Sequence, residues 1–382
     1  MQAVPPLSLY VHIPWCVRKC PYCDFNSHPM RGELDQESYI DALLADLERD
    51  LTLTGGRALQ SIFIGGGTPS LFAPALIGRL LAEIKIRLTW SESFEVTLEA
   101  NPGTLEAASF AGFRDAGVNR LSIGVQSFDS TCLRALGRIH GSDEAQKAVQ
   151  QARRAGFERI NLDLMFGLPE QTPESAQADL QTALELNPGH LSYYQLTIEP
   201  NTPFHHAPPA LPEEELIWQI QQQAQSLLSR AGYAQYEVSA YARVGQQCRH
   251  NLNYWTFGDY LGIGAGAHAK LTDRSGRVRR VSKWRHPEEY LRKVKEGKAV
   301  QGCRILSKED LVVEYLMNRL RLIAGFQTDD FVTRTGLPAA RLEPGLQLAM
   351  AQGLLGRNGE WITTTPLGRL FLNDLLALFM PD

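Results

Sequence analysis

Along the first two-thirds of the chain, apolar runs alternate with stretches in which apolar residues recur at helical spacing. The runs at residues 7–13, 61–65 and 94–99 predict strands. The segment after the first run repeats an apolar residue every four positions, which predicts an amphipathic helix with a buried face formed by Tyr39, Leu43, Leu47 and Leu51. Strands that alternate with amphipathic helices indicate a parallel sheet covered by helices.

A recurring unit of helix end, glycine and strand supports the same architecture. Gly117, Gly156 and Gly232 each follow a helical stretch and precede an apolar run. Glycine is favoured there because the chain turns through positive φ just past a helix C-terminus. About six such units predict an α/β fold, a partial TIM-like (β/α)6 barrel, in which sites form at the carboxyl ends of the strands.

The pattern changes near Leu306, where strands give way to helices. Three predicted helices and a hairpin follow in the order of a winged-helix module, at 308–323, 326–335, 339–352 and 354–363. Winged helices often bind DNA through a basic helix, but the third of these helices carries Arg341 against Glu343. A lid or partner-docking role is therefore preferred for this part of the chain.

The sequence thus predicts a barrel over 1–240, a connecting region over 241–305 and a mainly helical, winged-helix-like domain over 306–382. A chain of 382 residues with 44% hydrophobic and 21% charged residues is typical of a globular protein that buries a large core. The formal net charge of −4 provides no basic field for a nucleic-acid partner. No apolar run is long enough to span a bilayer, and the first residues lack the features of a secretory signal. We expect a cytoplasmic location and leave peripheral membrane association open.

Three cysteines lie directly after the first predicted strand with the spacing Cys-x3-Cys-x2-Cys, at Cys16, Cys20 and Cys23. Thiolates are the usual ligands of iron–sulfur clusters, and a four-iron cluster held by three cysteines leaves one iron open to a further ligand. The spacing differs from that of zinc ribbons, and no second Cys/His pair follows at finger spacing. We therefore predict a [4Fe-4S] cluster here. The other three cysteines are isolated and are interpreted as packing or surface thiols: Cys132, Cys248 and Cys303.

Polar or glycine residues close the other predicted strands of the barrel. A run of three glycines at 65–67 follows the second strand, where it is either a tight turn or a place where backbone approaches a ligand. Glu99, Gln126 and Asp163 close or interrupt later apolar runs. Buried carboxylates and amides need partners, which a ligand with hydroxyl and ammonium groups would supply, although strand-end capping or a salt bridge explains any one of them equally well.

The cysteine loop, including the aromatic Tyr22 before its last cysteine, resembles that of the radical S-adenosylmethionine superfamily. In that superfamily the amino and carboxylate groups of S-adenosylmethionine chelate the open iron. The reduced cluster then cleaves S-adenosylmethionine and so forms a 5'-deoxyadenosyl radical. Resemblance to the oxygen-independent coproporphyrinogen oxidases of this superfamily implies a set of S-adenosylmethionine contacts: Tyr10, Gly66, Thr68, Glu99, Gln126, Arg138 and Asp163.

A second motif resembles the one that is characteristic of the HemW-type haem chaperones: His250-Asn251-Leu252-Asn253-Tyr254-Trp255. That resemblance implies haem as a ligand, haem-accepting apoproteins as partners and a cluster-dependent homodimer. His250 is the best candidate for the haem ligand because a neutral imidazole binds haem iron. A packed histidine among aromatic neighbours is the competing interpretation.

One position separates two branches of the family. The oxidases extend the loop to a fourth cysteine two residues past Cys23, where this chain has Phe25. The leading hypothesis is therefore a haem chaperone on a radical S-adenosylmethionine scaffold. The rivals are an oxygen-independent coproporphyrinogen III oxidase and a radical enzyme with an unrelated substrate, and cleavage of S-adenosylmethionine in the physiological role is left open.

A basic stretch after the second motif also bears on haem. It surrounds a predicted turn at 273–276 and comprises Arg277, Arg279, Arg280, Lys283 and Arg285. Arginine side chains bind carboxylates such as haem propionates through charge-assisted hydrogen bonds. A solvated hairpin is the preferred interpretation at the level of sequence.

Overall fold

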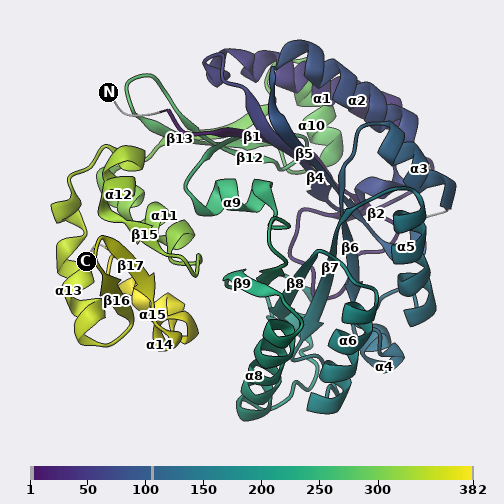
Figure 1. Ribbon diagram of the computed structural model, residues 1–382. Helices are drawn as coiled ribbons and strands as arrows, with labels where there is room; N and C mark the ends of the chain where they lie inside the picture. Colours follow the sequence, from purple (N-terminus) through teal and green to yellow (C-terminus); the bar gives the residue numbers. More distant parts are fainter. Residues whose placement is uncertain (1–3, 105–106, 381–382) are drawn as a thin grey trace.

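The computed structural model describes residues 4–104 and 107–380 and contains one sheet of twelve strands in the order β14-β13-β12-β11-β1-β4-β5-β6-β7-β8-β10-β9. The sheet curves around a concave interior, as Figure 1 shows. Six strands run parallel, each joined to the next by a helical crossover, and confirm the predicted partial barrel: β1 (Leu7–Ile13), β4 (Leu59–Gly66), β5 (Trp90–Ala100), β6 (Arg120–Gln126), β7 (Arg159–Phe166) and β8 (His190–Gln195).

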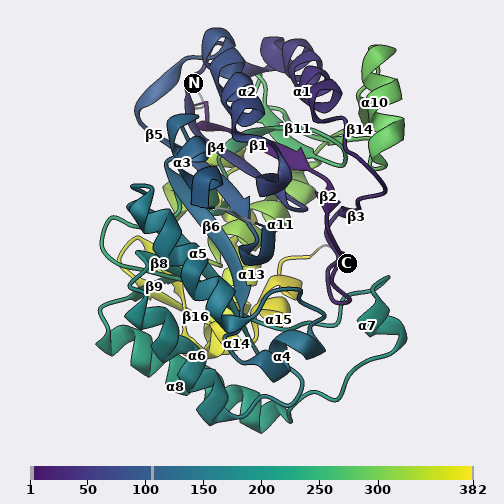
Figure 2. The ribbon, with the colours of Figure 1, turned by 90° about the vertical axis from the view of Figure 1, so that its right-hand side faces the viewer.

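Helices cover the outer, convex face of these strands (Figures 1 and 2). They are α1 (Gln36–Asp50), α2 (Pro74–Arg87), α3 (Ala107–Asp115), α5 (Ser142–Arg154), α6 (Pro173–Glu185) and α8 (Glu214–Arg230), with the short α4 (Ser130–Ala135) and α7 (Pro203–His206) in loops. The predicted face of α1 is confirmed, since Tyr39, Leu43 and Leu47 are fully buried. Leu51 already belongs to a 3-10 turn, η1 (Leu51–Thr54), that ends the helix.

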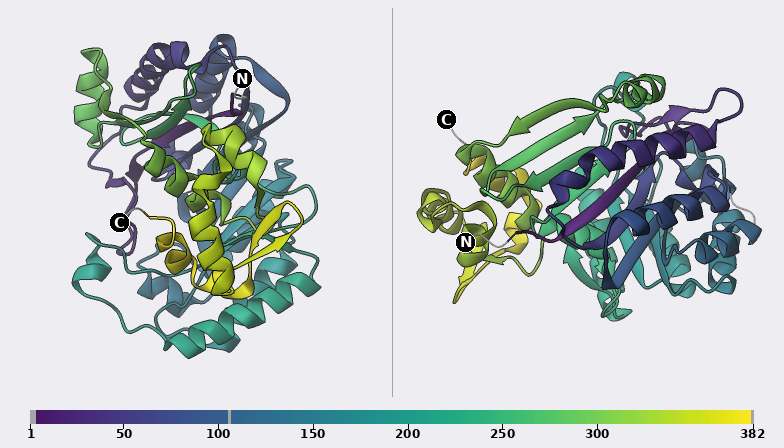
Figure 3. Two further views of the ribbon diagram at one scale, coloured as in Figure 1. Left: turned by 90° about the vertical axis from the view of Figure 1, so that its left-hand side faces the viewer. Right: turned by 90° about the horizontal axis from the view of Figure 1, so that it is seen from above.

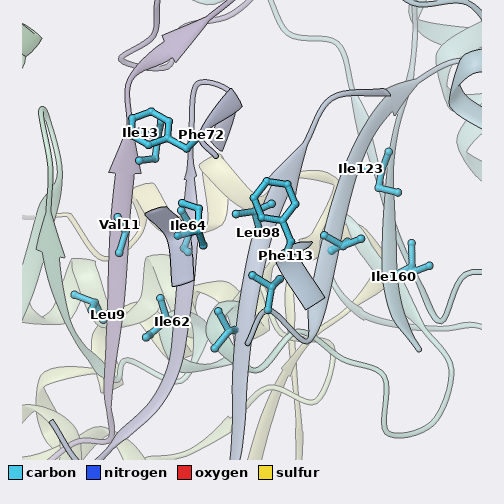
Figure 4. Close-up of a cluster of buried hydrophobic side chains, with 14 of the residues drawn as sticks. Leu9, Val11, Ile13, Ile62, Ile64, Phe72, Leu98, Phe113, Ile123 and Ile160 are labelled. Atoms are coloured by element: carbon cyan, nitrogen blue, oxygen red, sulfur yellow. The ribbon is translucent and has the colours of Figure 1, made fainter. Parts of the chain in front are cut away.

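Alternation along the strands separates an apolar face from a polar face. Leu9, Val11 and Ile13 of β1 pack with Ile62 and Ile64 of β4 beneath the helices (Figure 4). The residues between them therefore point into the concave interior, because successive side chains of a strand alternate sides. On β1 and β4 these are polar or aromatic, so the side chains that point into the barrel provide hydrogen-bonding groups.

Segments remote in sequence complete both edges of the sheet. The strand β11 (Asp259–Ile263) pairs parallel with β1, and β12 (His268–Thr272), β13 (Val278–Lys283) and β14 (Val300–Ile305) continue antiparallel. Residues 241–305 thus extend the main sheet, and they also contribute α9 (Arg249–Trp255) and α10 (Pro287–Lys295). At the other edge, β10 (Ala240–Ala242) and β9 (Ala234–Glu237) are antiparallel, so the unit at Gly232 ends in an edge hairpin and not in a further parallel strand.

The C-terminal residues form a domain beside the barrel (Figure 3), and its hydrophobic core also includes Phe257 and Val278. The order is α11 (Lys308–Arg319), β15 (Phe326–Gln327), α12 (Thr328–Thr335), α13 (Glu343–Ala351) and the hairpin of β16 (Leu355–Asn358) and β17 (Trp361–Thr364), followed by α14 (Pro366–Leu370) and α15 (Leu372–Ala377). Two predicted helix starts differ. Phe326 and Gln327 pair with β17 as a strand, and the helix predicted from 339 begins as a 3-10 turn, η4 (Ala339–Arg341). Among the described helices, none has the length and hydropathy needed to cross a bilayer.

Candidate cluster and cofactor site

The three loop cysteines lie together at the carboxyl end of β1. The short strand β2 (Trp15–Cys16) pairs with β3 (His28–Pro29) and so closes the loop at its base. Within the loop, the Cys23 N–H donates to the Cys20 carbonyl at 3.2 Å, and all three thiols are partly buried. The helix α7 lies beside the loop (Figure 2), where the Phe204 N–H donates to the Pro21 carbonyl at 3.0 Å. Phe25, at the place of the oxidases' fourth cysteine, is 60% exposed.

Hydrogen-bond donors surround these sulfurs. Arg138 Nη1 donates to Cys20 Sγ at 3.5 Å, and the Thr68 side chain hydrogen-bonds Cys16. Burial raises the pKa of the Cys16 and Cys23 thiols. Iron bound here would therefore displace their protons, as thiolate ligation requires, and the donors would then stabilise the thiolates.

The loop is also fixed to distant parts of the sheet. The amide of Asn26 donates to the Ala265 carbonyl at 2.9 Å and to the Arg285 carbonyl at 2.8 Å. Its own carbonyl oxygen lies 2.9 Å from His12 Nε2. Across residues 4–104 and 107–380, no three His, Cys, Asp or Glu side chains converge on one point as ligands of a single ion. A four-iron cluster makes a different demand, because each thiolate binds a different iron.

The glycine run after β4 leaves no room for side chains. Gly66 has φ +114°, and a Cβ at this position would lie 2.5 Å from the ring of His12. A Cβ on Gly67 would lie 2.4 Å from the Trp15 carbonyl oxygen, beside the base of the cysteine loop. Only glycine fits both positions, so the backbone of this loop approaches the cysteine loop closely.

Two carboxylates from neighbouring strands face the same region. Glu99 Oε2 accepts the Gly66 N–H at 2.9 Å, and burial, with Asp163 nearby, raises the pKa of Glu99 to about 7. Burial also raises the pKa of Asp163, opposed by hydrogen bonds from Asn161, Ser192 and Ser122. A cation bound between these carboxylates would relieve both the desolvation and the mutual repulsion. This is the electrostatic environment that suits an ammonium or sulfonium group.

The remaining predicted contacts enclose the same space. Arg138 Nη2 donates to Asn101 Oδ1 at 3.1 Å and to the Gly124 carbonyl at 2.7 Å. Gln126 is 7% exposed with φ +71°, and its Oε1 accepts the Tyr194 hydroxyl at 2.8 Å.

Tyr10 lies on β1, further from the cysteine loop than His12. Its hydroxyl is 2.9 Å from His12 Nδ1, and the charge of Glu99 adds to the burial that raises the pKa of Tyr10. The structure therefore brings together all seven predicted cofactor contacts with the cysteine loop.

Sequence reasoning missed four residues of this region: His12, Asn26, Asn101 and Tyr194. His12 and Tyr194 occupy interior positions of β1 and β8, so strict alternation along those strands identifies them. Asn26 and Asn101 lie in loops, where no periodic signal exists.

His250 lies elsewhere, at the amino ends of the strands. It is 1% exposed, with Nδ1 3.0 Å from the Ser61 hydroxyl and Nε2 2.8 Å from the Tyr254 hydroxyl. Burial lowers the pKa of His250 to about 3, so the imidazole is neutral. Ser61 bonds in turn to Ser8 at 2.8 Å. The structure does not bring His250 to the cysteine loop.

The aromatic residues of the same motif join the barrel to the C-terminal core. Tyr254 packs edge-on against Tyr260, with ring centroids 4.5 Å apart. The guanidinium of Arg321 lies 4.4 Å from the Trp255 ring centroid and also pairs with Glu237 at 3.3 Å. In this structure the residues of the motif therefore form a packed contact between the barrel and the C-terminal core.

Comparison with known proteins places this geometry in a family. Residues 10–183 match the radical SAM superfamily, and residues 306–371 match the HemN C-terminal domain. The fold is similar to that of coproporphyrinogen III oxidase (HemN) from Escherichia coli, with a TM-score of 0.84 and 26% identity over 98% of this chain and 90% of that one. Fold and cysteine loop together define a radical SAM protein of the coproporphyrinogen oxidase type.

Full-length relatives narrow the assignment. The chain is 50% identical over 382 residues to heme chaperone HemW of Escherichia coli, covering 100% of both chains. It is 49% identical to heme chaperone HemW of Haemophilus influenzae, again over 100% of each chain. A mouse protein, radical S-adenosyl methionine domain-containing protein 1, mitochondrial, is 34% identical over 98% of this chain and 87% of that protein. The chain belongs to the HemW family.

Proposed function

We propose that the chain is a haem chaperone that binds haem and transfers it to haem-requiring apoproteins. The observation that carries the proposal is the 50% identity, over the whole of both chains, with a relative named heme chaperone HemW. The residue two positions past Cys23 is consistent with this branch, because it is Phe25 where the oxidases have a fourth cysteine.

The scaffold holds two further groups in this proposal. Cys16, Cys20 and Cys23 ligate a [4Fe-4S] cluster, while Thr68 and Arg138 donate to their sulfurs. The glycine run, Glu99 and Asp163 would hold S-adenosylmethionine, and the two carboxylates would balance its positive charge. When bound, this pair of groups supplies one-electron chemistry. The residues of the chain position the sulfonium cofactor and surround it with protein on the interior side of the barrel.

The assignment of His250 as haem ligand stays a prediction, and the geometry sets a condition on it. Both ring nitrogens are hydrogen-bonded, so Nε2 binds iron only after the Tyr254 hydroxyl is displaced. The ring is also buried, so α9 must move away from the ends of β1 and β4. A haem site at His250 therefore requires opening of the barrel's amino end.

The decisive experiment is an anaerobic haem titration of the cluster-loaded full chain, followed by the Soret band and then by transfer to an apo-haemoprotein. We expect saturable one-to-one binding and transfer. No saturable binding would refute the proposal. Size measurement with and without cluster tests the proposed homodimer, and cell fractionation tests the cytoplasmic location.

The second candidate is oxygen-independent coproporphyrinogen III oxidase activity. It is favoured by the 0.84 TM-score with the Escherichia coli HemN structure and by the three loop cysteines that the chain keeps. Anaerobic incubation with coproporphyrinogen III and S-adenosylmethionine distinguishes the two candidates. We expect no decarboxylated product from this chain, and multiple turnovers would place it with the oxidases.

A further inference from the structure

A cavity lies outside the barrel, at the far end of β1 from the cysteine loop. It has a volume of about 640 Å³ and is formed by Val4, the turn after α1, the hairpin of β12 and β13, and β14. Organic ligands occupy pockets of roughly 300–1,000 Å³. None of the eleven predicted ligand positions lines this cavity.

Its floor and walls are apolar. Leu271 and Val281, from adjacent strands, are nearly buried and form the floor. Val4, Leu53 and Val300 line the walls, with 53%, 37% and 41% of their surfaces exposed. Apolar side chains exposed around a cavity favour a flat apolar ligand, because covering them removes apolar surface from water.

The rest of the lining is cationic. Four arginines and two aspartates line the cavity: Arg57, Arg274, Arg277 and Arg279, with Asp50 and Asp273. Arg57 pairs with the buried Asp259 and Asp50 with the buried Lys283, each at 2.7 Å, so the excess of two positive charges comes from the other three arginines against Asp273. Asp273 pairs with Arg277 at 3.0 Å and Arg279 at 3.3 Å and so positions both guanidinium groups. The Nε of Arg279 is buried without a partner among the described residues. Guanidinium groups prefer carboxylates, which they bind with two parallel hydrogen bonds.

One side chain in the lining can ligate haem iron. Haem iron in proteins is bound by His, Cys, Met or Tyr. Among the described residues that line the cavity, Cys303 is the only member of that set. It is exposed and pairs in register with Val281 of the floor, so both side chains emerge on the same face of the sheet.

We propose that this cavity is a haem site, in which the arginines bind the two propionates and Cys303 ligates the iron. The inference rests on the proposed chaperone function and gives it a location. Haem carries an apolar ring and two carboxylates, which match the apolar floor and the excess of two positive charges. Unlike His250, these groups are accessible without rearrangement, and the open position lets an apoprotein reach the haem away from the cluster.

The test compares haem with haem dimethyl ester, whose propionates are uncharged, on the cluster-loaded full chain. The wild-type chain should bind haem about tenfold or more tightly than the ester. The double variant Arg274→Ala/Arg277→Ala should lose that preference. Arg304→Ala is the matched control, because Arg304 adjoins Cys303 on β14 but pairs with Asp310 and Glu314. It should bind as the wild type does.

The iron ligand is tested in parallel with Cys303→Ser. This variant should weaken haem binding and change the Soret spectrum, while its binding of iron-free protoporphyrin stays unchanged. Saturable haem binding without ester discrimination, and with no effect of either variant, would overturn the cavity assignment and leave the chaperone proposal intact. Sensitivity to His250→Ala alone would place the haem at the motif instead. Absence of any saturable haem binding would overturn both.

Discussion

The Glu99 carboxylate should lower the stability of the folded protein at neutral and alkaline pH. Its pKa is about 7 in the fold, against 4.5 for an ordinary glutamate. The folded state therefore binds this proton more tightly than the unfolded state does, and ionisation of Glu99 costs free energy above pH 7. At 1.36 kcal/mol per pKa unit, the cost reaches at most about 3 kcal/mol. It shrinks as the pH falls through 7 and vanishes below about pH 4.5, where the group is protonated in both states.

The variant Glu99→Gln isolates this effect, because the amide oxygen can still accept the Gly66 N–H. In urea denaturation of the cluster-free chain, the variant should be more stable than the wild type by up to about 3 kcal/mol at pH 8, with no difference near pH 4.5. Glu92→Gln, at an exposed position on the same strand, serves as the control and should have no effect. Glu99→Gln should also bind S-adenosylmethionine less tightly than the wild type does. A variant that is equally or less stable at pH 8 would refute the argument that Glu99 is retained for the cofactor at a cost in stability.

Three further outcomes are expected. Alanine in place of any one of the loop cysteines should abolish iron–sulfur absorbance after reconstitution, whereas Cys132→Ala, in a buried apolar cluster, should retain it. Lys283→Met leaves two buried carboxylates of α1 unpaired and should destabilise by about 3–5 kcal/mol in urea denaturation; a loss below about 1 kcal/mol would show that water reaches them. Gly66→Ala meets the His12 ring at φ +114° and should cost about 2–5 kcal/mol more than Gly117→Ala, which has φ +105° and only an ordinary contact with Leu81 at 3.9 Å; equal losses would mean that the His12 ring moves aside.

The β/α order and the cysteine loop were predictable because their signals are local. Alternation, helical spacing and cysteine spacing are all contained within about 20 residues. The pairing of β11 with β1 joins residues about 250 positions apart and leaves no local pattern, so the segment at 241–305 was expected only as a connection. The unit at Gly232 has the same sequence pattern as the other helix–glycine–strand units. Its strand β9 lies at the edge of the sheet because it pairs antiparallel with β10, which the sequence pattern does not indicate.

The site was predictable in part for the same reason. Glu99 and Asp163 were identified because a charged residue interrupts an apolar run, and Gly66 because glycines cluster. The hydrogen bonds of His250 to Ser61 and Tyr254 depend on how α9 docks against β4, which no sequence pattern specifies. The two-residue strand β15 was missed because two residues are too few to show a period.

The anchoring of the cysteine loop has a consequence for biosynthesis. The loop is encoded before residue 30, yet Asn26 is held by the carbonyls of Ala265 and Arg285, and β1 pairs with β11. A ribosome must therefore translate about three-quarters of the 382 codons before the loop acquires its final support. Until then, the cysteine loop follows a strand, β1, that lacks one of its two neighbours. Delivery of iron and sulfide to the completed loop is thus a late event in the life of the nascent chain, and truncated products that end before residue 259 should not retain the cluster.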